Sequence, residues 1–144
     1  KVIVPKVKKE FAVVNGRSMR VSLKHAKAIG KYIKRMKIDR AIELLDKVSK
    51  KKLAVPFAGE LAHRKGKRLD GRGMDTGKYP VKASKEFIKL LKGLKGNCNV
   101  NGIELERAVI REVIANKAPN RMHRFGRERF KQTHIMIKAA EMKR

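Results

Sequence analysis

Two stretches in the last third of the chain decide its fold: Ala108-Val-Ile-Arg-Glu-Val-Ile114 and Thr133-His-Ile-Met-Ile137. Both are rich in residues that favour extended backbone, and together they predict the arms of an antiparallel hairpin over residues 107–140. Its tip, residues 117–131, carries six Lys or Arg against Glu128 alone, a local net charge of 6 − 1 = +5. Such a tip repels itself unless anions surround it, so the hairpin is predicted to need a polyanionic partner.

The charge of the whole chain indicates the same kind of partner. Its 144 residues hold 39 Lys and Arg against 13 Asp and Glu, a formal net charge of +26. This length predicts one domain, residues 1–144. Clustered Lys and Arg release the counterions condensed on nucleic acid, so RNA or DNA is the expected partner. A membrane is not expected, because no stretch approaches the roughly 20 apolar residues that span a bilayer.

Upstream of the hairpin, apolar spacing predicts three helices. The first begins at the N-cap Ser22 and ends near Met36, the second begins at the N-cap Asp39, and the third begins at Pro80 and ends before Gly102. Their apolar faces are formed by Ala26, Ile29, Ile33 and Met36, by Ala41, Leu44, Leu45 and Val48, and by Ala83, Phe87, Leu90, Leu91 and Leu94.

Before these helices, residues 11–21 are predicted to be extended around Asn15-Gly16, a dipeptide typical of tight turns. The expected fold class is α+β: three helices packed on a small antiparallel sheet, with a long basic β-hairpin as an extension.

A basic, glycine-rich loop is predicted over residues 53–79. Within it, Gly71-Arg-Gly-Met-Asp-Thr-Gly77-Lys78 is reminiscent of a phosphate-binding loop, but the spacing fails. Five residues separate the outer glycines instead of four, and Tyr79 follows Lys78 where Ser or Thr is required. The loop is therefore interpreted as RNA-facing and not as a nucleotide site.

No catalytic, metal or cofactor site is expected. The four histidines are scattered and Cys98 stands alone, whereas a metal site needs several converging ligands. Acidic residues such as Glu43 and Asp46 occupy predicted helix surfaces and form no catalytic pair. Cys98 is predicted to be a small buried side chain, and a single cysteine fits a reducing cytoplasmic compartment.

Two phenylalanines lie among the arginines of the tip. Phe125 and Phe130 have few apolar neighbours in sequence. Either they stack on unpaired bases or pack on an RNA surface, or one of them folds back onto the hairpin.

Several motifs resemble the universal large-subunit ribosomal protein family numbered twenty-two in bacteria and archaea and seventeen in eukaryotes. Arg20-Val-Ser-Leu-Lys24 is similar to the family's entry to its first helix, with Leu23 in place of the usual Pro. Asn116-Lys-Ala-Pro119, Gly126-Arg127 and Gln132-Thr-His-Ile-Met-Ile137 resemble the two arms of the family's long hairpin. Val55-Pro-Phe57 and Gly77-Lys-Tyr-Pro-Val-Lys82 resemble an insertion of its archaeal and eukaryotic members.

The resemblance implies a non-catalytic constituent of the cytoplasmic ribosome that binds large-subunit ribosomal RNA, supports assembly and extends its hairpin toward the nascent-peptide exit tunnel. Its implied partners are that RNA, neighbouring ribosomal proteins and the nascent peptide at the hairpin tip, with no membrane and no second copy of the chain. The residues expected to bind ribosomal RNA are Arg17, Arg20, Ser22, Lys24, Lys27, Arg64, Lys65, Lys67, Arg68, Arg72, Lys78, Lys117, Arg121, His123, Arg124, Phe125, Arg127, Arg129, Lys131 and His134.

Two features depart from the family pattern. The connection from Pro119 to Thr133 is several residues shorter than usual, and Glu128 adds a negative charge to a normally basic tip. These departures leave two readings open: a hairpin that stops short of the tunnel constriction, and one that belongs to a compacted ribosome.

Two other functions fit part of the pattern. A free-standing RNA- or DNA-binding regulator of the same fold would carry the same basic charge. A cationic membrane-active protein would need a broad apolar helix face rich in Phe or Trp, but the chain has no Trp.

Overall fold

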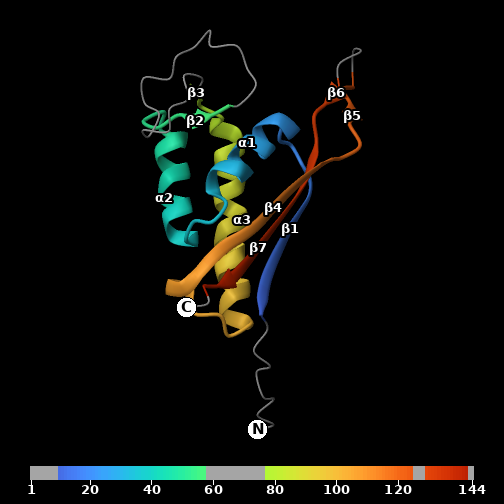
Figure 1. Ribbon diagram of the computed structural model, residues 1–144. Coiled ribbons are helices and arrows are strands. Elements are labelled where there is room, and N and C mark those ends of the chain that lie inside the picture. The colour runs from blue at the N-terminus through green and yellow to red at the C-terminus, as the bar shows by residue number, and fades with distance from the viewer. Residues whose placement is uncertain (1–9, 58–76, 125–128, 143–144) are drawn as a thin grey trace.

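The computed structural model describes residues 10–57, 77–124 and 129–142 (Figure 1). In chain order its elements are β1 (Phe11–Met19), α1 (Leu23–Ile33), α2 (Ile38–Ser49), β2 (Val55–Pro56), β3 (Gly77–Lys78), α3 (Val81–Val100), the 3-10 helix η1 (Leu105–Arg107), β4 (Ala108–Lys117), β5 (Arg121–Met122), β6 (Arg129–Phe130) and β7 (Thr133–Glu141). Three helices pack against an antiparallel sheet, so the predicted α+β fold is confirmed.

The sheet is built around β7, the central strand in the order β1-β7-β4. Both of its neighbours run antiparallel to it, with Phe11 opposite Ala140 in β1 and Lys117 opposite Thr133 in β4. Beyond Lys117 the same hairpin continues as the short pair β5 and β6. The predicted hairpin is thus confirmed, and it projects from one end of the body (Figure 1).

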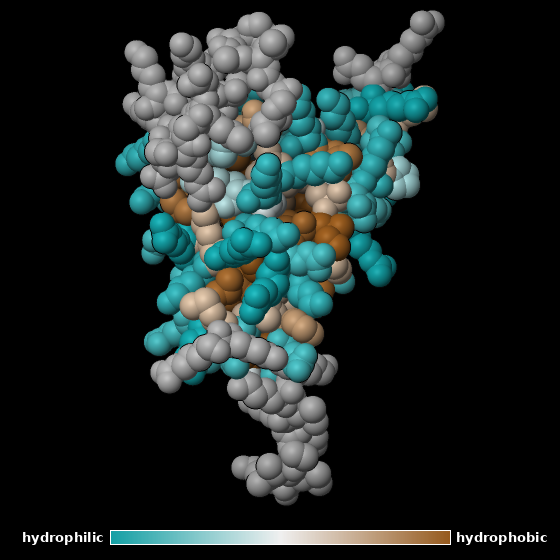
Figure 2. Space-filling view, in the orientation of Figure 1, coloured by the Kyte–Doolittle hydropathy of each residue, from teal (hydrophilic) through white to brown (hydrophobic). Residues whose placement is uncertain are grey.

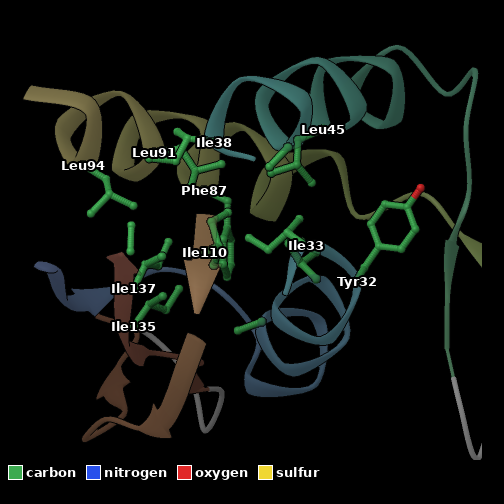
Figure 3. Close-up of a cluster of buried hydrophobic side chains, with 14 of the residues drawn as sticks. Tyr32, Ile33, Ile38, Leu45, Phe87, Leu91, Leu94, Ile110, Ile135 and Ile137 are labelled. Atoms are coloured by element: carbon green, nitrogen blue, oxygen red, sulfur yellow. The ribbon is translucent and has the colours of Figure 1, made fainter. Parts of the chain in front are cut away.

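The hydrophobic core lies between this sheet and the helices (Figure 3). Alternate residues of β7, namely Ile135, Ile137 and Ala139, are buried, as the two-residue period of a strand requires. Phe87 and Leu94 of α3 are fully buried in the same cluster. Burial of each large apolar side chain contributes roughly 1.5–3 kcal/mol, so this shared core holds the helices on the sheet.

The predicted apolar faces of the helices are largely the observed ones. Ala26, Ile29 and Ile33 of α1, Ala41, Leu45 and Val48 of α2, and Ala83, Phe87, Leu91 and Leu94 of α3 are buried, while Leu44 and Leu90 are partly buried against the core. Met36 lies beyond the end of α1.

Two glycines allow close approaches between elements. A Cβ placed on Gly30 of α1 would lie 2.9 Å from Val113 Cγ1 of β4, tighter than ordinary van der Waals contact. A Cβ on Gly16 of β1 would clash with the side chain of Met19 and lie 3.1 Å from Leu90 Cδ2 of α3. Residues without a Cβ at these positions let α1 lie on β4 and α3 on β1.

The extended segment predicted around Asn15-Gly16 is confirmed as β1. Both residues lie inside this strand, paired with Met136 and Ile135 of β7, and the register shifts only between Gly16 and Met19. Pairing with β7 thus overrides the local turn preference of the dipeptide, and Gly16 serves packing instead of a turn.

The boundary between the first two helices also differs from the prediction. α1 ends at Ile33 instead of near Met36, and α2 begins after the N-cap Lys37 instead of after Asp39. The cause is the edge of β4: Arg35 N–H donates to Ile110 O at 2.8 Å, and Ile110 N–H donates to Met36 O at 2.9 Å. These bonds and the bridge between Lys37 and Val109 hold residues 35–37 against the sheet, with Arg35 in the left-handed region (φ +67°), so the helix cannot continue through them.

α3 ends as predicted, just before Gly102. Gly102 has φ +71°, and two backbone bonds close the helix: Ile103 N–H to Cys98 O at 2.9 Å and Gly102 N–H to Asn99 O at 3.2 Å. This is a Schellman C-cap, in which glycine takes the left-handed position without strain. Cys98 is fully buried beside it, as predicted, and burial raises the pKa of its thiol.

Both outer edges of the sheet are covered within the body. On β1, Asn97 Nδ2 donates to Val13 O at 2.8 Å and Asn101 Nδ2 donates to Phe11 O at 3.1 Å. On β4, residues 35–37 cover the edge as described above. These segments of both edges are therefore closed to pairing with a further strand. No described helix combines the length and apolarity needed to cross a membrane.

Candidate nucleic-acid interface

A groove between the start of α1 and the base of the hairpin gathers basic side chains from both elements. It has a volume of about 560 Å³ and is lined by Ser22, Leu23, Lys24, Lys27, Lys117, Asn120, Lys131 and Gln132. We call it the lysine groove, because four of these residues are lysines and, within the described part of the chain, no Asp or Glu lines it. Five of the residues predicted to bind RNA meet here, although those of α1 and those of the hairpin lie at least 117 − 27 = 90 positions apart in sequence.

The start of α1 adds partial positive charge to the lysine groove. Ser22 is extended (φ −69°, ψ 132°), but its side chain makes no capping hydrogen bond, and the first turn of α1 holds no acidic residue. Backbone N–H groups at a helix start attract anions, above all phosphates, and the neighbouring lysines strengthen that field. The lysine groove therefore has the chemistry of a phosphate site.

Buried hydrogen bonds hold the two walls of the lysine groove together. Thr133 Oγ1, at the start of β7, donates to Val21 O at 2.8 Å, which ties the hairpin base to the residue before Ser22. Across the hairpin, Ala118 N–H donates to Gln132 O at 3.1 Å. The backbone positions of the lysines relative to one another are therefore set by the fold.

A stack of three side chains attaches the hairpin to the body next to the lysine groove. The rings of His123 and Phe130 lie 3.5 Å apart between centroids, at 25° to each other. Arg20, in the segment between β1 and α1, holds its guanidinium carbon 4.9 Å from the centroid of Phe130. Phe130 therefore folds back onto the hairpin, which is one of the two alternatives that its sequence environment left open.

Arg17 and His134 meet in a second hollow where the hairpin leaves the sheet. Its volume is about 420 Å³, and its lining is Asn15, Gly16, Arg17, Ile114, Asn116, His134, Ile135 and Met136. Ser18 N–H donates to His134 Nδ1 at 3.1 Å, which fixes this ring against the end of β1. Arg17 is exposed.

The arginines in the described part of the hairpin lie outside both hollows. Arg121 and Arg129 are exposed on β5 and β6, one residue out of direct register with each other, and Arg124 is exposed just beyond β5. Hydrophilic side chains cover this end of the molecule in Figure 2. This surface continues the basic character of the lysine groove along the hairpin.

Lys78 lies apart from these groups, at the base of the predicted 53–79 loop. There β2 and β3 pair, with Val55 opposite Lys78, which the sequence did not predict. Lys78 Nζ lies 5.5 Å from the ring centroid of the buried Phe57, and the His25 ring of α1 meets Phe57 edge-on at 5.5 Å. The remaining predicted residues, Arg64, Lys65, Lys67, Arg68, Arg72, Phe125 and Arg127, lie outside the described residues.

Sequence reasoning missed the amides of the lysine groove, Asn120 and Gln132, and Asn116 of the second hollow. Each is next to a predicted basic residue in sequence, and Asn116 and Gln132 also belong to the motifs that resemble the family's hairpin, so both signals could have found them. Within the described ranges, no group of three or more His, Cys, Asp or Glu residues could hold a metal ion.

The geometry and charge of the site suit a polyanionic partner. The body is basic, lysines line a groove at a helix start, and a hairpin with exposed arginines projects from the sheet. Comparison with known proteins makes this assignment more specific. The family of ribosomal proteins L22p/L17e matches residues 14–141. The chain therefore belongs to the L22p/L17e ribosomal protein family, as the resemblance of its motifs indicated.

Its relatives include archaeal proteins named large ribosomal subunit protein uL22. That of Cenarchaeum symbiosum is 35% identical over 132 residues, which cover 87% of this chain and 86% of the relative. That of Haloquadratum walsbyi is 41% identical over 106 residues, covering 72% of this chain and 65% of the relative. That of Methanocaldococcus jannaschii is 38% identical over 105 residues, which cover 71% of this chain and 65% of the relative.

Proposed function

We propose that this chain is a structural, non-catalytic constituent of the large ribosomal subunit that binds ribosomal RNA through the lysine groove and the hairpin. The observation that carries the proposal is the convergence of Lys24, Lys27, Lys117 and Lys131 on one hollow at an uncapped helix start. An RNA backbone in this groove would relieve the mutual repulsion of these lysines. Family membership supports the ribosome as the setting.

The hairpin gives the protein reach beyond its body. Arg121 and Arg129 are exposed along it, and arginine binds phosphate bidentately and stacks on bases. The stack of Arg20, Phe130 and His123 supports a hairpin held at a defined angle, which suits insertion between RNA helices. By the family resemblance, the hairpin supports assembly, extends toward the nascent-peptide exit tunnel and meets the nascent peptide there, in the cytoplasmic ribosome beside neighbouring ribosomal proteins.

The salt dependence of RNA binding tests the role of the lysine groove. Lys27→Gln, Lys117→Gln and Lys131→Gln each remove one cation, and Lys92→Gln is the control because Lys92 is exposed on α3 outside the lysine groove. Each groove substitution should lower the magnitude of the slope of log affinity against log salt by about 0.7–0.9, whereas the control should leave it unchanged. Equal slopes for all four variants would contradict binding at the lysine groove.

Sedimentation separates a ribosomal constituent from a free-standing RNA- or DNA-binding regulator. A tagged full chain should sediment with large subunits in a one-to-one ratio in moderate salt. Recovery mainly off ribosomes, or at a small fraction of the subunit number, would favour the regulator.

A further inference from the structure

Apolar side chains are exposed together at the end of the molecule opposite the hairpin, where β1 begins and α3 ends (Figure 1). Val100 is 72% exposed, Phe11 42% and Val13 37%. These three residues line a groove of about 380 Å³ with Asn97 and Asn101, which we call the β1–α3 groove. Contiguous exposed apolar side chains rimmed by polar groups are typical of surfaces that bind another molecule.

The walls of the β1–α3 groove are fixed by hydrogen bonds. Asn97 and Asn101 donate to the outward carbonyls of Val13 and Phe11, at 2.8 and 3.1 Å. These bonds occupy the edge of β1, so the occupant cannot add to the sheet as a further strand. It must instead insert side chains between Phe11 and Val100.

The described segments around the β1–α3 groove carry a net negative charge, unlike the chain as a whole. The described segments that form this end, residues 10–13, 97–107 and 138–142, contain four carboxylates and only two cations; the carboxylates are Glu10, Glu104, Glu106 and Glu141. Both cations have partners at this surface. Arg107 Nε lies 3.2 Å from Glu104 Oε2, and Lys138 Nζ lies 4.0 Å from the ring centroid of Phe11. Among the described residues this surplus of carboxylates favours a cationic partner over phosphate.

The C-terminal end of α3 adds to the attraction for cations. α3 is 20 residues long and has no basic residue in its last turn, whereas α1 has Lys31 and α2 has Lys47 there. The partial negative charge of this helix end therefore lacks the cation that the other two helices supply for themselves. Lys or Arg of a bound molecule would supply the missing cation at this helix end.

We propose that the β1–α3 groove docks a basic protein, which inserts an apolar side chain between Phe11 and Val100 and sets Lys or Arg against the surrounding carboxylates. The proposal rests on the proposed function for its setting, since basic proteins are the neighbours available within a ribosomal subunit. A rival occupant is the chain's own segment 1–9, which directly precedes this surface in sequence and lies outside the described residues.

Site-specific photo-cross-linking in cells that express the full chain tests this docking surface. A photoreactive amino acid replaces Val100 in one variant and Met122 in a matched control, because Met122 is 64% exposed but lies on β5 of the hairpin. Position 100 is expected to cross-link to one basic protein, identified by mass spectrometry as a component of the large subunit. Cross-links from position 100 to RNA, to residues 1–9 of the same chain or to nothing above background would overturn the proposal.

The control position reports on the proposed function separately. Cross-links from position 122 to ribosomal RNA support RNA binding by the hairpin, and their absence counts against it, whatever position 100 captures. Val100→Lys should then lower the yield of the captured protein in pull-downs of the full chain by on the order of tenfold, because it places a cation against a basic partner. Glu43→Gln is the matched control, because it raises the net charge by the same amount at an exposed position of α2, outside both the hairpin and the β1–α3 groove. It should leave that yield unchanged, and an equal loss for both variants would contradict docking at the β1–α3 groove.

Discussion

Replacing Gly30 with alanine tests how closely α1 lies on β4. The new methyl would lie 2.9 Å from Val113 Cγ1 and 3.3 Å from Val113 Cβ. Valine is stiff at χ1, so relief requires a shift of the helix or strand, and overpacking of this kind costs about 1–3 kcal/mol. Alanine also stabilises a helix by about 1 kcal/mol relative to glycine, which offsets part of this cost. The expected net result is a loss of about 1 kcal/mol in the free energy of unfolding.

Gly96→Ala is the matched control, since it makes the same chemical change in α3. A Cβ at Gly96 has no atom within 4 Å, so only the helical preference acts and stability should rise by about 1 kcal/mol. The two variants should therefore differ by about 2 kcal/mol in urea unfolding of the full chain, followed by far-ultraviolet circular dichroism. A gain at Gly30 equal to that at Gly96 would refute the close approach of α1 to β4.

A double substitution checks the cause of the loss. In Gly30→Ala with Val113→Ala, the nearest obstacle to the new Cβ, Val113 Cγ1, is gone, and only the Cβ at 3.3 Å stays. Gly30→Ala should then cost at least 1 kcal/mol less than it does beside Val113, because contacting residues couple by about 0.5–3 kcal/mol. Additive effects would show that Val113 is not the obstacle.

Three further results are expected. Ser84→Ala should raise the free energy of unfolding by about 1 kcal/mol, because Ser84 Oγ is buried with no hydrogen-bond partner among the described residues; a loss of stability would argue for a bond that the structure does not contain. Thr133→Val should lower it by about 1–3 kcal/mol, because the substitution removes the 2.8 Å bond that satisfies Val21 O, and an unchanged urea midpoint would contradict that role. Cys98, whose thiol pKa burial raises, should react with iodoacetamide at about pH 8 much more slowly in the native protein than in urea, and equal rates would show that the thiol is accessible.

The parts of the fold that local pattern determines could be predicted from the sequence. The apolar spacing around Leu45 and Phe87 located the buried faces of α2 and α3, since a helix face must bury whatever repeats at its period. β-branched residues around Ile110 and Ile135 located the arms of the hairpin. Gly102 marked the end of α3, because the left-handed position there favours glycine.

The errors occurred where distant residues override local preference. Local preference alone would also place a turn at Asn15-Gly16, but both residues pair with β7 inside the predicted extended segment. Asp39 was predicted as an N-cap, but contacts with the edge of β4 make Lys37 the N-cap instead. Asp39 lies in the first turn of α2, where it pairs with Lys95 at 2.6 Å.

The candidate site was predictable residue by residue but not as an arrangement. Lys27 and Lys131 were both expected to bind RNA on charge and resemblance, yet nothing in their spacing indicated that they line one groove. Their convergence follows from the packing of α1 on β4, which depends on tertiary contacts. The stack of Arg20 on Phe130 could not be read from sequence for the same reason.

The central position of β7 has a consequence for how the chain folds as it is made. β7 joins β1 to β4, so residue 11 finds its partner only when residue 140 has been synthesised. Until then β1 and β4 have no strand between them, although the segments that form the helices are already available. Pairing over so long a stretch of chain is slow, and it leaves apolar strands uncovered in the meantime. We therefore expect the newly made protein to be most prone to aggregation during this interval, until β7 has paired with both neighbours.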